Sequence, residues 1–470
     1  MAETSPGPEP VKQASAPGID TGLQIPEEEM RRLGYWVVDQ VVDHFARGAQ
    51  GPVTNRGDAQ ALWSSLGGPV PQEPGDPEAA MQLLTEVGFG HMQHGDHPRF
   101  FARVPSPSSF AGVLGEWLGT GFNAITASWG GSSGPATVEL VVLAWLRDAL
   151  GMPAETEGVL LSGGSLASVT ALSAARAHLG PGVAYLSDQT HASIPRGLRS
   201  IGFSADEIRI LESDARNRLP ASTLMDALAE DRSAGRTPRF VVATAGTTNT
   251  GAVDPLPELA DICERDGMWL HIDGAYGAPA ALCERGRAAL VGMARADSLV
   301  LDPHKWLFQP YDIGCLLIRP GVLSEAYRMD PEYLVDVRAR AGEVDFYNRS
   351  LELTRRARAL KLWLTFRIHG LSRISAAIER GIELAEVAES LVRRDSRYEL
   401  VTPAQLGIVT FALTDEGDTS HERRAARLAE SGYAAVTATT ISGRSVLRLC
   451  TINPRTTHED LRETLERLAK

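Results

Sequence analysis

The stretch Ser298-Leu-Val-Leu-Asp-Pro-His-Lys-Trp306 decides the fold that we expect for this chain of 470 residues. It begins as an apolar run with the length of a short strand and ends in polar and charged side chains. Upstream, Trp269-Leu-His-Ile-Asp-Gly-Ala-Tyr276 repeats the pattern and carries a lone aspartate, Asp273. In open α/β sheets, ligands bind beyond the carboxyl ends of the strands. The two stretches therefore predict a sheet with Lys305 and Asp273 at its ligand-binding edge.

The surrounding pattern supports an α/β fold with a smaller second lobe. Apolar runs alternate with helical segments over residues 110–370, which implies right-handed crossovers and a largely parallel sheet. The expected strands are 158–161, 183–186, 239–243, 268–272 and 297–301, with shorter ones near 398–401, 408–413 and 446–450. We expect a disordered leader over 1–24, a helical segment over 25–109, a large domain over 110–370 and a small α+β domain over 371–470.

The composition excludes several classes of function. A net charge of −13 argues against nucleic acids and anionic membranes as partners. No apolar run approaches the roughly 20 residues that span a bilayer, and a cytoplasmic protein is expected. The four cysteines show no CxxC spacing, so reduced, buried thiols are predicted. His91, His94 and His97 are not expected to bind a metal, because no carboxylate or cysteine frame accompanies them.

A lysine and a carboxylate at one sheet edge suit the chemistry of pyridoxal 5'-phosphate (PLP). This cofactor needs an amine to hold its aldehyde as a Schiff base and a carboxylate to keep its pyridine nitrogen protonated. A buried lysine such as Lys305 can be a nucleophile at neutral pH, because desolvation lowers its pKa. Taken singly, Lys305 is more typical of a surface lysine, and Asp273 fits a turn cap equally well. Their occurrence together favours a cofactor site.

Small polar residues at other strand ends offer contacts for the phosphate and the ring. Ser162-Gly-Gly-Ser165 precedes a helix, whose first N–H groups can bind a phosphate, although an ordinary N-cap would look the same. Gly246-Thr-Thr248 could reach the phosphate or ring, or could be a plain turn. His304 could add a phosphate or imine contact. His191 could stack on the ring, but a histidine at a strand end is often only a satisfied polar residue.

Five segments of the chain resemble the group II PLP-dependent decarboxylases, the family of aromatic-L-amino-acid and glutamate decarboxylases. They are His97-Pro-Arg-Phe-Phe101, Ser187-Asp-Gln-Thr-His191, Trp269-Leu-His-Ile-Asp273, Asp302-Pro-His-Lys-Trp306 and Asn453-Pro-Arg-Thr-Thr457. The resemblance extends from about Glu27 to Leu468. It implies the type I, aspartate aminotransferase-like fold with a mostly parallel seven-stranded sheet. It also implies a homodimer with its active sites at the subunit interface.

The resemblance further implies a role for each candidate residue. Lys305 would form the internal aldimine, Asp273 would pair with the pyridinium, and His191 would stack on the ring. Tyr333, at the start of an expected mobile loop, would reprotonate Cα after CO2 leaves, which favours an amine over an aldehyde as the product. The other expected cofactor contacts are Gly164, Ser165, Thr248, Asp302 and His304, with Leu353 and Thr354 supplied by the neighbouring subunit.

The expected substrate pocket departs from that of the aromatic-amino-acid decarboxylases. Several positions that are aromatic in those enzymes are small or charged here. Arg103 would pair with an acidic or polar substrate tail, or would be an exposed arginine on an edge strand. The substrate therefore stays open between aromatic, acidic and non-proteinogenic L-amino acids. The pocket positions are Gly95, Arg103, Ser106, Ile125 and Ala127.

The sequence leaves three functions to compare. The leading hypothesis is the decarboxylation of an L-amino acid to the amine and CO2. An aldehyde synthase or an aminotransferase on the same scaffold is the enzymatic alternative. A catalytically silent, dimeric binding protein is the alternative from another class, but a scaffold has no need of the catalytic set. That set is Lys305, Asp273, His191 and Tyr333.

Overall fold

The computed structural model describes residues 22–329, 331–414 and 419–470, and the chain divides into two compact units. The smaller unit comprises Met1–Gly48 and Asp58–Gly90, and the larger one comprises Ala49–Gly57 and His91–Lys470. The leader predicted for residues 1–24 lies outside the described residues as far as residue 21.

The smaller unit consists of helices whose starts can be read from their sequences. α1 (Glu27–Arg47) begins with three glutamates, which interact favourably with the positive end of the helix dipole. α2 (Ala59–Leu66) and α3 (Pro77–Leu83) each follow an aspartate whose carboxylate accepts N–H groups of the first turn. The helical segment predicted from residue 25 thus begins with a helix.

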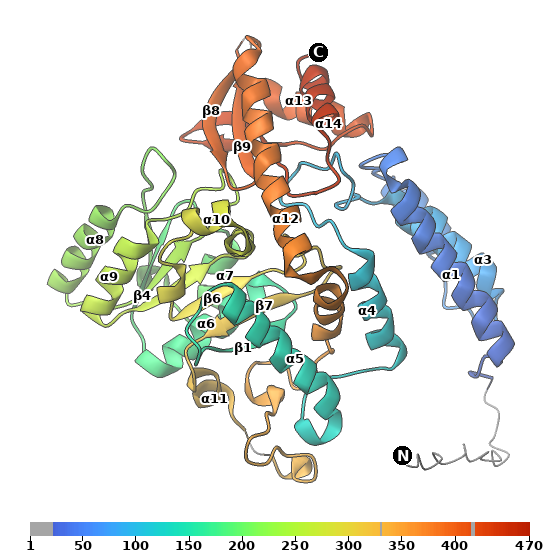
Figure 1. Ribbon diagram of the computed structural model, residues 1–470, viewed down its shortest axis with the longest axis horizontal. Coiled ribbons are helices and arrows are strands. Elements are labelled where there is room, and N and C mark those ends of the chain that lie inside the picture. Colours follow the sequence, from blue (N-terminus) through green and yellow to red (C-terminus); the bar gives the residue numbers. More distant parts are fainter. Residues whose placement is uncertain (1–21, 330, 415–418) are drawn as a thin grey trace, which may run out of the picture. The chain divides into compact units, whose positions relative to one another are not determined.

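The larger unit is organised around a seven-stranded sheet with the order β1-β7-β6-β5-β4-β2-β3 (Figure 1). Only β7 runs antiparallel to its neighbours, β1 and β6, so the mostly parallel sheet that the sequence predicted is confirmed. The strands are β1 (Glu157–Leu161), β2 (Val183–Ser187), β3 (Ile208–Leu211), β4 (Pro238–Thr244), β5 (Trp269–Asp273), β6 (Ser298–Leu301) and β7 (Gly314–Ile318).

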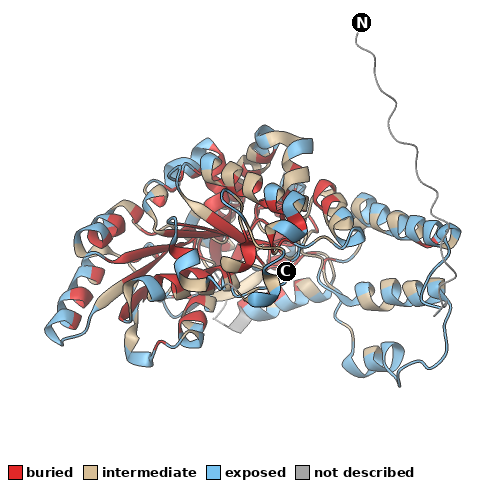
Figure 2. Ribbon diagram, turned by 90° about the horizontal axis from the view of Figure 1, so that it is seen from below, coloured by how far each residue is buried: buried red, intermediate tan, exposed pale blue. Residues whose placement is uncertain are grey.

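Helices cover the sheet and bury its central strands (Figure 2). In β5 to β7 every residue is buried, which is why these strands read as continuous apolar runs rather than alternating ones. The helices of this part are α4 (Phe110–Gly121), α5 (Trp129–Ala149), α6 (Gly164–Leu179), α7 (Ser193–Ser200), α8 (Ala221–Ser233), α9 (Leu256–Asp266), α10 (Glu284–Ala289) and α11 (Val322–Tyr327).

Two strands of this sheet were not predicted. β3 is a short edge strand in which Ile210 is exposed, so it lacks the fully apolar pattern of the inner strands. β7 follows β6 without an intervening α-helix and runs antiparallel to it, so the alternation of strands and helices gives no signal there.

The carboxyl-terminal part is a four-stranded antiparallel sheet with helices, as the expected α+β composition indicates. Its strand order is β10-β11-β9-β8. α12 (Ala359–Arg394) leads into it and contains a break at Gly370, where φ is 69°. The domain boundary at residue 370 stays a prediction. The other elements are β8 (Tyr398–Gln405), β9 (Ile408–Leu413), α13 (Thr419–Glu430), β10 (Thr437–Ile441), β11 (Arg444–Cys450) and α14 (His458–Leu468), of which β10 was not predicted.

Strand register determines which loops meet at the carboxyl edge of the large sheet. Thr244, Asp273 and Val300 lie side by side across β4, β5 and β6. β1 and β6 are both antiparallel to β7 and are therefore parallel to each other. The segments that follow β1, β4, β5 and β6 thus leave the sheet at one edge.

Two further predictions from the sequence concern the cysteines and membrane-spanning helices. The four cysteines are free and buried, as predicted. Across the described part of the chain, no helix combines the length and the apolar character needed to cross a membrane.

Candidate active site

A cavity of about 410 Å³ opens at the carboxyl edge of the large sheet. Residues from the loops after β1, β2, β4, β5 and β6 line it. The sequence had singled out eight of them from separate motifs, and the fold brings these eight together. They are Gly164, Ser165, His191, Thr248, Asp273, Asp302, His304 and Lys305.

Two carboxylates surround the side chain of Lys305. Its Nζ lies 2.9 Å from Oδ2 of Asp302, and the buried carboxylate of Asp273 also acts on it. Burial alone would lower the pKa of Lys305, but Asp302 and Asp273 outweigh burial and raise it above the ordinary value. Lys305 is therefore held as an ammonium ion in this arrangement.

Asp273 is a buried carboxylate with few compensating contacts. Burial raises its pKa, while the Lys305 charge and the N–H of Ala275, 3.1 Å from its Oδ1, oppose that rise. A second cation beside this carboxylate would stabilise its ionised form. The protonated ring nitrogen of a pyridine would be such a cation.

The turn between β1 and α6 leaves the start of the helix open. Gly163 is the N-cap of α6, and no side chain among the described residues caps this helix, so its first N–H groups are not occupied by a side chain. When a helix begins without a side-chain cap, its first N–H groups favour an anion such as phosphate. A Cβ on Gly164 would lie 3.0 Å from Oδ2 of Asp302 and 3.1 Å from Cβ of Ala275, so glycine keeps this corner open.

Two histidines line the cavity, one buried and one exposed. His304 is buried, and its Nδ1 accepts the N–H of Ile313 at 3.3 Å. Burial lowers the pKa of His304, so the ring is neutral at pH 7. His191 is exposed, and its Nδ1 accepts the N–H of Ser193 at 3.3 Å. The hydroxyl oxygen of Ser193 lies 2.8 Å from the same Nδ1.

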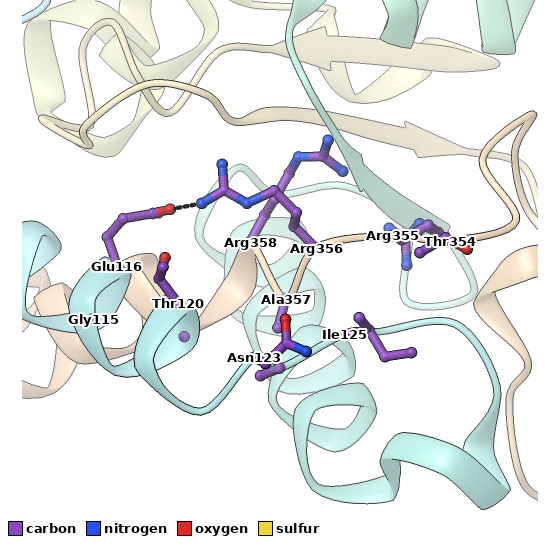
Figure 3. Close-up of a pocket in the computed structure, with 12 residues that line it drawn as sticks. Gly115, Glu116, Thr120, Asn123, Ile125, Thr354, Arg355, Arg356, Ala357 and Arg358 are labelled. Atoms are coloured by element: carbon purple, nitrogen blue, oxygen red, sulfur yellow. Dashed lines mark hydrogen bonds and ion pairs between the residues drawn. The ribbon is translucent and has the colours of Figure 1, made fainter. Parts of the chain in front are cut away.

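Other predicted residues line a second cavity, of about 390 Å³ (Figure 3). Ile125 and Thr354 belong to its wall, and Leu353 beside it is 53% exposed. Arg356 reaches across to Glu116, as Figure 3 shows. This cavity shares no lining residue with the first one, which contains Lys305 and is called the Lys305 cavity below. Within one chain, the predicted site residues that line a cavity are therefore divided between these two cavities.

A buried ion pair fixes the wall of the second cavity. Arg355 and Glu139 have fully buried side chains, and Nη2 of Arg355 lies 2.7 Å from Oε1 of Glu139. The same guanidinium bonds the carbonyl oxygens of Thr126 and Leu160, which ties the segment to α5 and to β1. Removing either partner would leave a buried charge unpaired, at a cost of about 3–5 kcal/mol.

The remaining predicted pocket residues line neither cavity. Ser106 donates its hydroxyl to the carbonyl of His304, and its N–H bonds the carbonyl of Gly95 at 3.1 Å. Arg103 is exposed on a loop, with its guanidinium 5.8 Å from the centre of the Phe100 ring. The carbonyl of Ala127 accepts the N–H of Tyr347. A recognition role for these residues stays a prediction.

Tyr333 and His97 lie away from the Lys305 cavity. Tyr333 is 73% exposed on the short turn Glu332–Leu334 and does not line the cavity. His97 is buried, its Nδ1 accepts the N–H of Arg99 at 3.0 Å, and burial lowers its pKa to about 4. This contact gives His97 a structural role.

Sequence reasoning missed Tyr311. Its ring centre lies 4.8 Å from that of His304. Lys361 fixes the loop by donating to the carbonyls of both flanking residues, Pro310 and Asp312, at 3.0 Å each. Only the loop conformation brings this tyrosine to His304, so no motif could indicate it. Leu166, Ser193, Thr244 and Tyr276 line the cavity and were not predicted either.

Comparisons with known proteins agree with this geometry. The family model described as the pyridoxal-dependent decarboxylase conserved domain matches residues 69–414. An aromatic-L-amino-acid decarboxylase from Bacillus atrophaeus is 43% identical, over 96% of this chain and 97% of its own. A phenylacetaldehyde synthase from a Rosa hybrid cultivar is 33% identical, over 82% and 80%. The crystal structure of Oryza sativa TDC with PLP and tryptamine is 29% identical, with a TM-score of 0.89 over 94% of this chain and 97% of that one.

Proposed function

This chain belongs to the pyridoxal-dependent decarboxylase family, and we propose from this premise that it converts an aromatic L-amino acid to the corresponding amine and CO2. It is a PLP-dependent carboxy-lyase. The observation that carries the proposal is the single cavity in which Lys305, Asp273 and the amino end of α6 meet. The relative from Bacillus atrophaeus, which matches this chain over nearly its full length, supports an aromatic substrate.

The cavity fits PLP in size and in chemistry. Its volume of about 410 Å³ lies within the range of about 300–1,000 Å³ for small-molecule sites. Lys305 would hold the aldehyde, Asp273 the ring nitrogen, and the first turn of α6 with Ser165 the phosphate. When bound, PLP supplies an electron sink for bond cleavage at the substrate's Cα.

Each side chain would have a distinct task. Asp273 would keep a proton on the pyridine nitrogen, and its burial strengthens this charge pairing. Ser193 would orient His191, whose Nε2–H would face the substrate. Lys305 would hold the cofactor again once the amine product has left.

We also propose that a second copy of the chain completes the site. Ile125 and Leu353 are 40% and 53% exposed, and the cavity that contains Ile125 and Thr354 is separate from that of Lys305. In a dimer with twofold symmetry, these residues would reach the cavity of the partner. Tyr333, which is exposed on its turn, would do the same and donate a proton to Cα after closure of its loop excludes water.

A substrate screen tests the proposal. PLP-loaded protein would be incubated with L-tryptophan, L-tyrosine, L-phenylalanine, L-DOPA, L-glutamate and L-cysteine sulfinate, with CO2, amine, aldehyde and ammonia quantified together. Equal amounts of CO2 and amine from an aromatic substrate are expected. Aldehyde with ammonia would instead identify an aldehyde synthase, which is the activity that the name of the Rosa relative states. Activity only on the acidic substrates would refute the aromatic assignment.

A further inference from the structure

Asp302 is an unusual neighbour for an anion-binding site. It follows β6 directly and is 3% exposed. Its Oδ2 lies 2.9 Å from Nζ of Lys305 and 3.6 Å from Nε2 of His304. Its Oδ1 is buried and has no hydrogen-bond partner among the described residues. One oxygen is thus paired with the lysine, and the other is left without a donor.

The carboxylate of Asp302 lies at the end of α6 that would receive a phosphate. A Cβ on Gly164 would be 3.0 Å from Oδ2 and 3.3 Å from Oδ1, so both oxygens border the first turn of the helix. An ionised carboxylate only accepts hydrogen bonds, and so do phosphate oxygens without protons. The two groups cannot bond each other, and their like charges repel strongly in a buried site.

We propose that Asp302 acts as an electrostatic gate on cofactor loading, which pairs with Lys305 in the empty site and opposes the phosphate of the incoming cofactor. This inference rests on the proposed function, since it assumes that Lys305 and the amino end of α6 bind PLP. It differs from the expectation that Asp302 is a favourable cofactor contact. Asp302 would set how tightly and how fast the cofactor is bound.

The state of Lys305 supports the same proposal independently of the phosphate. An amine must be neutral to attack an aldehyde. Burial would lower the pKa of Lys305, but Asp302 makes the largest opposing contribution and helps to raise it. The gate therefore acts on both ends of the cofactor, through repulsion of the phosphate and through protonation of the amine.

The test compares PLP with pyridoxal, which lacks the phosphate. Full-length protein, stripped of cofactor, would be titrated with each ligand, and the absorbance of the bound form would give both dissociation constants. Asp302→Asn should increase the preference for PLP over pyridoxal by about tenfold or more, because one unfavourable charge pair near the phosphate is removed. Binding of both ligands should also become faster, because Lys305 loses the partner that keeps it protonated.

A matched control is available at the other end of the same strand. Asp297 precedes β6 and bonds the N–H of Leu270 and the guanidinium of Arg319, so Asp297→Asn removes one charge away from the cavity. This control should leave the preference unchanged. If Asp302→Asn does not fold, Asp302→Ser removes the same charge and retains the backbone bond to Ala275.

Two negative outcomes differ in meaning. An unchanged or smaller preference for PLP in the Asp302 variants, with both ligands still bound, would overturn the gate alone. If borohydride reduction attached neither ligand to Lys305 in the unsubstituted protein, the proposed function and the gate would both be wrong.

Discussion

At the scale of single residues, the chemistry of this protein depends on charges that face one another in a small volume. Lys305 has Asp302 at 2.9 Å and Asp273 nearby, both buried. A lysine in such company is neither a free surface cation nor a neutral nucleophile. Its reactivity depends on which of its two carboxylates is engaged elsewhere, and PLP would engage Asp273.

Replacement of Lys305 tests its covalent role. Lys305→Ala should lose the cofactor's Schiff-base absorbance and reduce decarboxylation to the background rate. Lys305→Arg keeps the positive charge beside Asp302 but has no amine that can bind an aldehyde, so it should be equally inactive. Absorbance spectra and CO2 release check both variants. Turnover by either variant would rule out Lys305 as the amine.

Tyr333→Phe tests the proposed proton donor. Because general acid catalysis contributes about 10²–10⁴-fold, amine formation should fall by about a hundredfold or more, while CO2 release continues and aldehyde, ammonia and peroxide appear with dissolved O2 as the oxidant. The measurement is the ratio of amine to aldehyde at equal CO2. Tyr311→Phe is the matched control, since it removes a phenol close to His304 instead. Amine as the sole product of Tyr333→Phe would assign the proton to another group.

At the scale of elements, strand ends and helix starts create the site. α6 begins at Gly164 directly after the turn that leaves β1, without a side-chain cap. β5 and β6 end at Asp273 and just before Asp302, and their register places these ends on one edge. The helix offers N–H groups, and the strands offer charged side chains.

Gly164→Ala tests the closeness of α6 to the strand ends. The new Cβ would lie 3.0 Å from Asp302 and 3.1 Å from the Ala275 side chain, so the corner that receives the phosphate must open by a few tenths of an ångström. PLP affinity should fall by about tenfold. Gly134→Ala, whose Cβ meets open space in α5, is the control and should leave the affinity unchanged. Equal titration curves for both variants would contradict the assignment.

The buried histidine of β5 predicts how stability depends on pH. His271 is fully buried beside Ser298, and burial lowers its pKa to about 3. Since the folded pKa lies below the unfolded value, the stability present above about pH 6.5 is lost as pH falls toward 3. His271→Gln should flatten the decline between pH 6 and 4 by about 1.4 kcal/mol per pH unit. Denaturant unfolding at several pH values would measure how the free energy of unfolding changes with pH. The control is His458→Gln, which replaces an exposed histidine and should keep the slope of the unsubstituted protein.

At the scale of the whole molecule, the predicted site residues that line cavities are divided between two separate cavities. The Lys305 cavity contains the residues proposed to hold the cofactor, whereas Ile125 and Thr354 line a separate cavity whose wall is fixed by the Arg355–Glu139 pair. Exposed apolar residues such as Leu353 beside the second cavity are expected at a surface that another chain covers.

Mixing inactive variants tests whether sites are shared between chains. Dimers formed from Lys305→Ala and Tyr333→Phe chains should recover about a quarter of the original amine formation, because half of them contain one intact site. The double variant mixed with unsubstituted protein is the control, since sharing would then damage both sites of each mixed dimer. Amine formation no greater than the sum of the separate variants would mean that each chain forms its own site.

The sheet edge and its charged residues could be predicted from the sequence alone. Apolar runs that end in polar residues revealed β5 and β6, and the glycines before α6 predicted an anion site, because such signals are local in the chain. The sequence did not predict β7, which has no helix between it and β6, and it did not indicate Tyr311, which reaches His304 only through its loop conformation.

Which of these residues meet could be learned only from the three-dimensional structure. It joined eight predicted residues in one cavity, set Ile125 and Thr354 apart in another, and turned Asp302 toward Lys305 and the first turn of α6. The physical reason is that residue type follows from local pattern, whereas distance and burial depend on strand register and loop path. The distance and the burial of a carboxylate determine how strongly it repels a bound phosphate.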